Sequence, residues 1–398
     1  MSLKILFVID GLGPGGAERS LLEILPRLAG ANIESTVAFF YRREESLEAL
    51  FREQGADLRF LPQQGVVHRV AALRRLIRTE RPDVVHTALF ESDVIGRLAS
   101  IGQNTVVVSS LVNTPYDPIR LQNCDVNMVK LWAVRVIDAS TARYLTTHFH
   151  AVSEPVKAAA VKTLHLPADR ITVIERGRNG RFGLPSPERR KQARLKLGLK
   201  DSDEVIINVG RQEYQKGQRY LLEAMEGVAR RRPLSLLLIA GRRGRQSENL
   251  EEIQQRIALN GRVRLLGYRE DVPDLLACAD LFVFPSLYEG LGGALIEAMA
   301  LGLPIVASRV PAIESVVEEG KNALLVERAS VVPLADAITD LLTDRERARA
   351  FGCRSRTIFE ERFTLDRCAA RMIELYRRLT GHNDRLTVDR PISELRCG

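Results

Sequence analysis

Short apolar runs alternate along the chain with stretches whose apolar residues recur every three to four positions. Runs at Lys4–Ile9, Ser35–Phe40 and Asp83–His86 have strand character, and a helical spacing of leucines follows the first. A second series begins near residue 201, with runs at Val205–Val209 and Leu234–Ala240. Strands separated by helices form parallel βαβ units rather than hairpins. The sequence therefore predicts an α/β chain of two doubly wound, Rossmann-like domains facing a central cleft.

The length of 398 residues accommodates two such domains. We expect a first domain at 1–170 and a second at 171–360, joined by a linker around 165–200 where proline and arginine cluster. A helix at 361–380 is expected to pack back toward the first domain, and 381–398 is expected to be a tail.

The charge balance points to an anionic partner. Lys and Arg total 58 against 50 Asp and Glu, which gives a formal net charge of +8. Nucleic acid, acidic lipid head groups and phosphorylated small molecules all fit that excess. The aromatic content of 6%, with one tryptophan, disfavours a base-stacking platform and hence nucleic acid.

The cysteine pattern indicates in which cellular compartment the chain resides and whether it binds a metal. None of the five cysteines forms a Cys-x-x-Cys pair, which disfavours a zinc site and favours a reducing, cytoplasmic compartment. We predict no essential metal. Since no run of about 18 apolar residues occurs, we expect contact with a membrane from one side at most.

Three glycine-rich turns follow predicted strands, where helix N-termini bind anions in α/β sheets. The first contains Gly15 and Gly16 but lacks the G-x-G-x-x-G spacing of dinucleotide sites, and a simple tight turn is its alternative. The second runs from Gly210 through Arg211 to Lys216. Two cations beside a helix start suit a diphosphate, although a solvated surface pair is the alternative.

The third turn separates two glutamates by eight residues, Glu289 in the turn and Glu297 in the helix that follows. Eight residues of helix span about 12 Å. The two carboxyls of a retaining glycosidase lie only about 5–5.5 Å apart. We therefore expect each glutamate to contact a different ligand hydroxyl, with the free amides around 292–294 facing phosphate.

The segment from Glu289 to Glu297 resembles the E-x7-E motif of retaining, GT-B-fold, nucleotide-sugar glycosyltransferases of family 4 (group 1). The flanking segments are similar to those of the family as well, at 209–217, 267–276, 279–286, 297–308 and 319–326. The first half matches more loosely, at 15–20 and 84–87. The resemblance covers about residues 3–375.

The resemblance implies roles for individual residues. Arg211 and Lys216 would hold the diphosphate, Glu289 would contact the donor sugar, and Glu297 would bind the ribose. Arg211, Lys216 and Glu289 would carry catalysis. The remaining donor-binding positions would be Gly15, Gly16, Gly210, Arg269, Gly290, Leu291, Gly292 and Gly293.

The resemblance also implies the substrates. We expect a UDP-sugar rather than a GDP- or ADP-sugar as donor, and no cofactor. The acceptor would be a hydroxyl of a glycan, a lipid-linked molecule or a small molecule, in cell-surface polysaccharide or glycoconjugate biosynthesis. Two rival functions remain: a GT-B epimerase or phosphorylase, and a non-catalytic scaffold that binds sugar nucleotides.

The sequence departs from the family pattern in two places. Asn113 stands where the family often has a histidine near the donor sugar, and an amide carries no proton at neutral pH. In retaining transfer the departing phosphate can receive the acceptor proton instead. The second departure is I-E-R-G-R-N at 174–179, where the family shows P-N-G-(V/I)-D, and its arginines either alter the hinge or meet an anion.

Other polar positions have competing interpretations. His86 either lies on the acceptor side or is a structural histidine. A metal pair at His148 and His150 needs further ligands, and 201–203 (D-S-D) is interpreted as a loop or cap. The basic amphipathic stretch 69–81 suits either a membrane surface or a solvated face. The region 116–144 is a candidate acceptor entrance.

Overall fold

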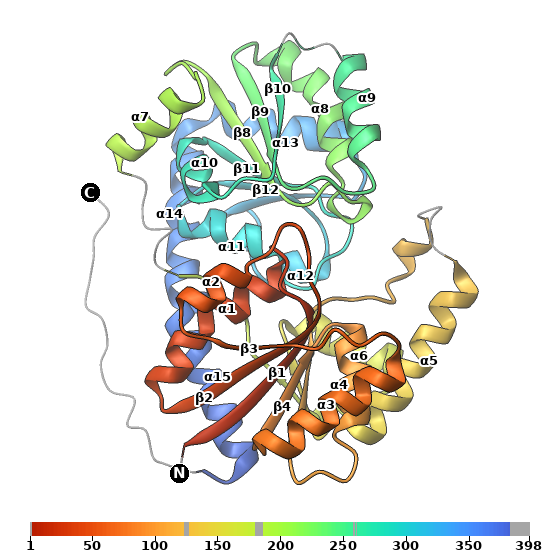
Figure 1. Cartoon of the computed structure of the whole chain (residues 1–398). Coiled ribbons are helices and arrows are strands. Elements are labelled where there is room, and N and C mark those ends of the chain that lie inside the picture. Colours follow the sequence, from red (N-terminus) through yellow and green to blue (C-terminus); the bar gives the residue numbers. More distant parts are fainter. Residues whose placement is uncertain (1, 123–126, 180–185, 258, 260, 383–398) are drawn as a thin grey trace. The chain divides into compact units, whose positions relative to one another are not determined.

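The computed structural model describes residues 2–122, 127–179, 186–257, 259 and 261–382. The chain divides into two compact units. Unit 1 comprises Met1–Tyr116, Asn127–Gly177 and Leu365–Gly398, and unit 2 comprises Asp117–Val126 and Arg178–Thr364. Each unit contains one parallel sheet covered by helices, and the predicted α/β fold with two Rossmann-like sheets is confirmed (Figure 1).

The sheet of unit 1 has seven strands in the order β3-β2-β1-β4-β5-β6-β7, and every neighbouring pair is parallel. The order reverses between β1 and β4, which makes the carboxyl ends of these strands the switch point of the sheet. The strands are β1 (Leu3–Gly11), β2 (Ile33–Tyr41), β3 (Asp57–Phe60), β4 (Val84–Ala88), β5 (Val106–Leu111), β6 (His148–Ala151) and β7 (Ile171–Val173). The helices are α1 (Gly16–Gly30), α2 (Glu48–Glu53), α3 (Val66–Glu80), α4 (Phe90–Ala99), α5 (Met128–Leu145), α6 (Glu154–Leu164) and α15 (Leu365–Thr380).

Strand β1 supplies both cores of unit 1, because successive side chains point to opposite faces of a sheet. Ile5 and Phe7 pack with residues of α1 and α15 on one face. Leu6 and Val8 pack with residues of α3 and α4 on the other. Figure 1 shows these helix pairs on the two sides of β1.

Unit 1 extends beyond the boundary expected at residue 170. Strand β7 pairs with β6, which continues the first sheet to Val173. Helix α15 belongs to the same unit and buries Met372 and Tyr376 in the core beside β1 and α1. Asp366 of α15 forms an ion pair of 3.0 Å with Arg27 of α1. Most of the tail expected at 381–398, namely residues 383–398, lies outside the described residues.

The sheet of unit 2 has six parallel strands in the order β10-β9-β8-β11-β12-β13, with the switch point between β8 and β11. The strands are β8 (Glu204–Val209), β9 (Ser235–Ala240), β10 (Val263–Gly267), β11 (Leu281–Phe284), β12 (Ile305–Ser308) and β13 (Ala323–Val326). The helices are α7 (Pro187–Lys196), α8 (Gln218–Arg231), α9 (Ser247–Ile257), α10 (Val272–Cys278), α11 (Gly293–Ala300), α12 (Pro311–Glu314), α13 (Val331–Thr343) and α14 (Arg345–Arg362).

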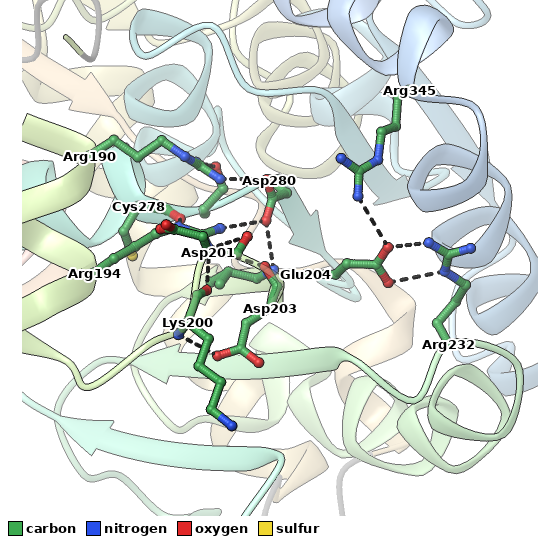
Figure 2. Close-up of polar contacts among 12 residues, drawn as sticks. Arg190, Arg194, Lys200, Asp201, Asp203, Glu204, Arg232, Cys278, Asp280 and Arg345 are labelled. Carbon is green, nitrogen blue, oxygen red and sulfur yellow. Dashed lines mark hydrogen bonds and ion pairs between the residues drawn. The ribbon is translucent and has the colours of Figure 1, made fainter. Parts of the chain in front are cut away.

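Buried Arg194 attaches α7 to the amino-terminal end of this sheet (Figure 2). Its guanidinium donates to Asp280 Oδ2 at 2.9 Å and to the Cys278, Lys200 and Asp203 carbonyls. Asp280 Oδ2 also accepts the amide of Val205 in β8 at 2.8 Å. Part of the stretch expected to be a linker is therefore a helix with a buried anchor.

The same network accounts for the D-S-D segment at 201–203. Asp203 Oδ1 accepts from Arg262 at 2.9 Å, and its Oδ2 accepts the amide of Lys200 at 2.8 Å. These contacts lower the pKa of Asp203, against the opposing effect of burial. They favour the interpretation of this segment as a structural loop, at the end of the strands opposite to their carboxyl ends.

Candidate functional site

The loops that follow β8 and β11 touch at the switch point of unit 2. Gly217 ends the β8 loop with φ of +59°, and a Cβ there would lie 2.0 Å from the carbonyl oxygen of Pro285. Only glycine fits that approach. The Leu287 amide donates to the Gln215 carbonyl at 2.8 Å, and Gln215 Nε2 donates to the Tyr288 carbonyl at 2.9 Å.

Lys216 and Glu289, one from each loop, form a close ion pair. The distance from Lys216 Nζ to Glu289 Oε1 is 2.5 Å, and the side chains are 17% and 7% exposed. The ammonium also lies 5.3 Å from the ring centre of Phe284. An ammonium has three N–H donors, so this bond leaves donors for a second anion.

Arg211 stands at the start of the same loop, directly after Gly210. Its side chain is exposed and forms no ion pair with any residue that the structure describes. The β8 loop therefore offers one paired and one unpaired cation. Such a loop suits an anion with more than one charged group, because hydrogen bonds to ionised groups are the strong ones.

The N-terminus of α11 adds backbone donors close to Glu289. Gly292 caps the helix and its carbonyl accepts the amides of Leu295 and Ile296. The amides at the start of a helix have no intrahelical partner, which applies here to Gly293 and Ala294. The first turn carries no acidic residue that would neutralise its partial positive charge.

Arg178 is also part of this site, although sequence reasoning identified it only as part of the 174–179 segment that departs from the family pattern. Its Nε donates to Glu297 Oε1 at 2.9 Å, and the two side chains are 3% and 13% exposed. A Cβ on Gly293 would lie 2.2 Å from Arg178 Nη2, so the guanidinium rests on the first turn of α11. Glu297, expected at the ribose, therefore has one oxygen held by a buried arginine.

Arg269, expected among the donor-binding positions, and the nearby Arg243 are both engaged with acidic neighbours. Arg269 donates to both oxygens of Asp271, at 2.8 and 2.6 Å, and this hydrogen bonding lowers the pKa of Asp271. Arg243 pairs with Glu251. Arg269 lies two residues after the end of β10, at the same carboxyl edge of the sheet as Gly210 and Arg211.

The remaining predicted residues belong to unit 1. Gly15 caps α1 and Gly16 is its first residue, and the Glu18 carboxylate lies where a Cβ of Gly15 would be. Asn113 follows β5, and its Oδ1 accepts the amide of Thr114 at 2.8 Å. Gly15 and Gly16 lie after β1, at one edge of the switch point of this sheet.

His86 is enclosed in a chain of hydrogen bonds that crosses unit 1. His150 Nε2 lies 2.8 Å from the Ile174 carbonyl, which only accepts, so Nε2 carries the proton and Nδ1 accepts from Ser110 at 3.0 Å. Ser110 then accepts from His86 Nε2 at 2.7 Å, and His86 Nδ1 accepts from Tyr376 at 2.5 Å. The chain therefore has one direction, from Tyr376 to Ile174.

Burial keeps both of these histidines neutral. It lowers the pKa of His86 to about 3, with smaller contributions from His150 and Arg176, and the pKa of His150 to about 4. With both ring nitrogens of His86 occupied, these contacts favour the structural interpretation of that residue. His148 Nε2 contacts the Thr172 hydroxyl at 2.8 Å. Among the described residues, no group of three or more His, Cys, Asp or Glu side chains is arranged to hold a metal.

Helix α3 uses its apolar side inside unit 1. Leu73 and Ile77 are buried in the core, and Arg69 is buried in contact with Glu91 and Tyr41. The side left to solvent carries arginines such as Arg75 and Arg78. The stretch 69–81 therefore lacks the free apolar face that an interfacial membrane helix requires.

Comparisons with known proteins agree with this architecture. The family model described as "Glycosyl transferases group 1" matches residues 203–344, and the model described as "Glycosyltransferase Family 4" matches residues 14–179. No helix in the described part of the chain combines the length and apolar character needed to cross a membrane.

Three relatives illustrate the range of similarity. The UDP-Gal:alpha-D-GlcNAc-diphosphoundecaprenol alpha-1,3-galactosyltransferase of Escherichia coli is 26% identical over 277 residues, 69% of this chain and 70% of the relative. The O-antigen chain mannosyltransferase B of Escherichia coli is 30% identical over 234 residues, 57% and 60% of the two chains. The structure of HepE from Anabaena with UDP and glucose superposes with a TM-score of 0.83 at 22% identity, covering 94% of this chain and 99% of HepE, which shows a shared fold.

Proposed function

This chain belongs to the group 1 glycosyltransferases of family 4, and from that premise we propose that it transfers a sugar from UDP to an acceptor hydroxyl with retention of configuration. The acceptor is a glycan or a lipid-linked molecule, in cell-surface polysaccharide or glycoconjugate biosynthesis. The reaction takes place in the cytoplasm, at the inner face of the membrane. UDP in the structure of HepE and UDP-Gal in the name of the galactosyltransferase support this donor.

The arrangement of Arg211, Lys216 and the first turn of α11 carries the proposal. A diphosphate at the carboxyl ends of β8 and β11 would meet three kinds of donor: the guanidinium of Arg211, which has no ion pair among the described residues, the remaining donors of Lys216, and the amides of Gly293 and Ala294. Negative charge grows on the diphosphate as its bond to the sugar breaks. Preorganised donors aimed at that charge lower the barrier more than they stabilise the bound donor.

Glu289 and Glu297 position the donor in this proposal. Glu289, held by Lys216, accepts hydrogen bonds from sugar hydroxyls, and Glu297, held by Arg178, accepts from the ribose. The departing phosphate receives the acceptor proton, so Asn113 need not act as a base. The cations and amides, rather than a metal ion, neutralise the leaving group.

Titration calorimetry with UDP, GDP and ADP tests the donor. We expect measurable binding of UDP and at least about tenfold weaker binding of the other two, a difference of 1.4 kcal/mol. Equal affinities would contradict the choice of base, and no binding of any of the three would contradict the site.

Donor-consumption assays with UDP-glucose and UDP-galactose test the reaction. We expect sugar transfer that depends on an added lipid-linked or soluble glycan acceptor. Epimerisation of the donor without acceptor would favour the epimerase, and phosphorolysis would favour the phosphorylase. Binding of UDP-sugars without turnover on any acceptor would favour the scaffold.

A further inference from the structure

Helix α5 of unit 1 exposes an apolar stripe that no described residue covers. Val129 and Tyr144 are 76% and 78% exposed, and Trp132 is 64% exposed. The other exposed apolar residues of the helix are Met128, Val136 and Ile137, at 60%, 42% and 47%. In Figure 1 α5, drawn in yellow, lies on the outer side of unit 1.

These residues lie on one side of the helix. Residues 129, 132, 133, 136, 137, 140 and 144 follow the spacing of three and four that places side chains in one stripe. The opposite side is anchored: buried Asp138 accepts from Arg97 of α4 at 2.8 Å and from the hydroxyl of Tyr116 at 2.9 Å, and Ala142 is fully buried. The ion pair fixes the rotation of α5, so the stripe faces solvent.

The charged residues on and beside the stripe are of one sign. Lys130, Arg135 and Arg143 are all exposed. The single acidic residue of α5 is Asp138, and it lies on the buried side with Arg97 as its counter-ion. The outer surface of α5 therefore combines aromatic and aliphatic side chains with cations and carries no anion.

We propose that α5 is an interfacial helix that docks unit 1 on an anionic lipid bilayer. Its apolar stripe would enter the boundary between head groups and acyl chains, where tryptophan and tyrosine are favoured, and its cations would contact lipid phosphates. The basic side chains are long enough to keep their charges at the head groups while the stripe is buried. This surface replaces the 69–81 stretch, whose apolar side lies in the core.

The fluorescence of Trp132 reports directly on the surroundings of α5, because Trp132 is the only tryptophan of the chain. Full-length protein is titrated with vesicles of phosphatidylcholine and with vesicles containing 30% phosphatidylglycerol, without nucleotide. We expect a blue shift of the fluorescence and co-sedimentation with the anionic vesicles, weakened by salt because exposed charges are screened. No blue shift and no co-sedimentation with anionic vesicles would overturn the proposal.

Matched variants locate the surface. Val129→Asp is expected to weaken vesicle binding at least about tenfold, since it places an anion in the stripe. Lys130→Ala and Arg143→Ala should each weaken it about fivefold. Val67→Asp on α3 is the control, because Val67 is 78% exposed yet lies outside α5. Equal binding by the Val129 and Val67 variants would overturn the proposal.

The competing occupant is a second copy of the chain. Light scattering after size exclusion, without lipid, distinguishes the two. A monomer at micromolar concentration supports lipid docking. A dimer that Val129→Asp dissociates would overturn it and assign the stripe to self-association. Since UDP binding is measured separately in unit 2, failure here leaves the donor proposal untouched.

Discussion

Arg178 and Glu297 lie 119 residues apart in the sequence and form an ion pair of 2.9 Å at the first turns of α11. Removing one partner of a buried pair strands the other charge. The pair therefore couples the segment that enters unit 2 to the carboxylate proposed to bind the ribose. Glu297 depends on Arg178 for its orientation, and a loss at either position should show in nucleotide binding.

A double-mutant cycle measures this coupling. Arg178→Met and Glu297→Gln should each weaken UDP binding about tenfold, equivalent to 1.4 kcal/mol. The double variant should bind little more weakly than either single variant, with a coupling energy of about 1–2 kcal/mol in calorimetry. Losses that simply add would show that Arg178 does not act through Glu297.

Gly293 offers a second route to the same pair. Alanine there would place a methyl group 2.2 Å from Arg178 Nη2, and moving the guanidinium would disturb its bond to Glu297. Gly293→Ala should therefore weaken UDP binding about tenfold. Gly30→Ala is the matched control, because a methyl group at that position, at the end of α1, would have no atom within 4 Å. Wild-type affinity in the Gly293 variant would contradict the placement of Arg178.

Lys216 is predicted to act in the chemical step. Lys216→Met should lower kcat about 100- to 1,000-fold, the range found when one donor to a developing charge is removed. It also leaves the Glu289 carboxylate without its ion pair, so activity is assayed well below the melting temperature of the variant. Lys191→Met, an exposed lysine on α7, is the control. Equal turnover of the two variants would remove Lys216 from the mechanism.

The buried histidines predict how stability depends on pH. Folding lowers the pKa of His86 to about 3 and of His150 to about 4, from 6.5. Between pH 6.5 and 4 the unfolded chain therefore binds more protons, and acid destabilises the fold. The effect is on the order of 2 kcal/mol for each histidine at pH 5. Burial raises the pKa of Asp93 to about 7. The folded chain therefore binds a proton at Asp93 more readily than the unfolded chain does, so this group makes acid stabilise the fold.

The His150→Gln variant contains the same carboxylates as the wild type, so comparing the two proteins cancels the contribution of the carboxylates to the pH dependence of stability. Thermal unfolding from pH 7.5 to 5 should show a smaller decrease in melting temperature for the variant than for the wild type. The slope is the readout, because the substitution lowers the melting temperature at every pH. Parallel slopes would show that His150 is not held neutral.

Local sequence patterns were enough to predict the two parallel sheets and their central strands, but not the edge strands β3, β7 and β13. Buried strands such as Val205–Val209 appear as continuous apolar runs, and the glycine turns follow their ends. The E-x7-E spacing identified Glu289 and Glu297 as ligand candidates. These features depend on residues close in sequence, which is why periodicity and motif spacing reveal them.

Long-range contacts could not be predicted in the same way. No local pattern pairs Arg178 with Glu297, or places Tyr376 of α15 against His86, 290 residues earlier. The apolar stripe of α5 has the same period as a buried face, so only the exposure of Val129 distinguishes it. Likewise, the sequence of 69–81 suited either a membrane surface or a solvated face, because the burial of Leu73 and Arg69 is a tertiary property that the local pattern does not reveal.

Calorimetric titration of UDP into the Arg211→Ala variant tests the diphosphate site most directly. Arg211 is exposed and has no ion pair among the described residues. Its removal should therefore change the free energy of unfolding by no more than about 0.5 kcal/mol. We expect UDP affinity to fall about 10- to 100-fold, as for the loss of a hydrogen bond to a charged group. Arg349→Ala, an exposed arginine on α14, should bind UDP like the wild type. Wild-type affinity in the Arg211 variant would contradict the assignment of this loop to the diphosphate.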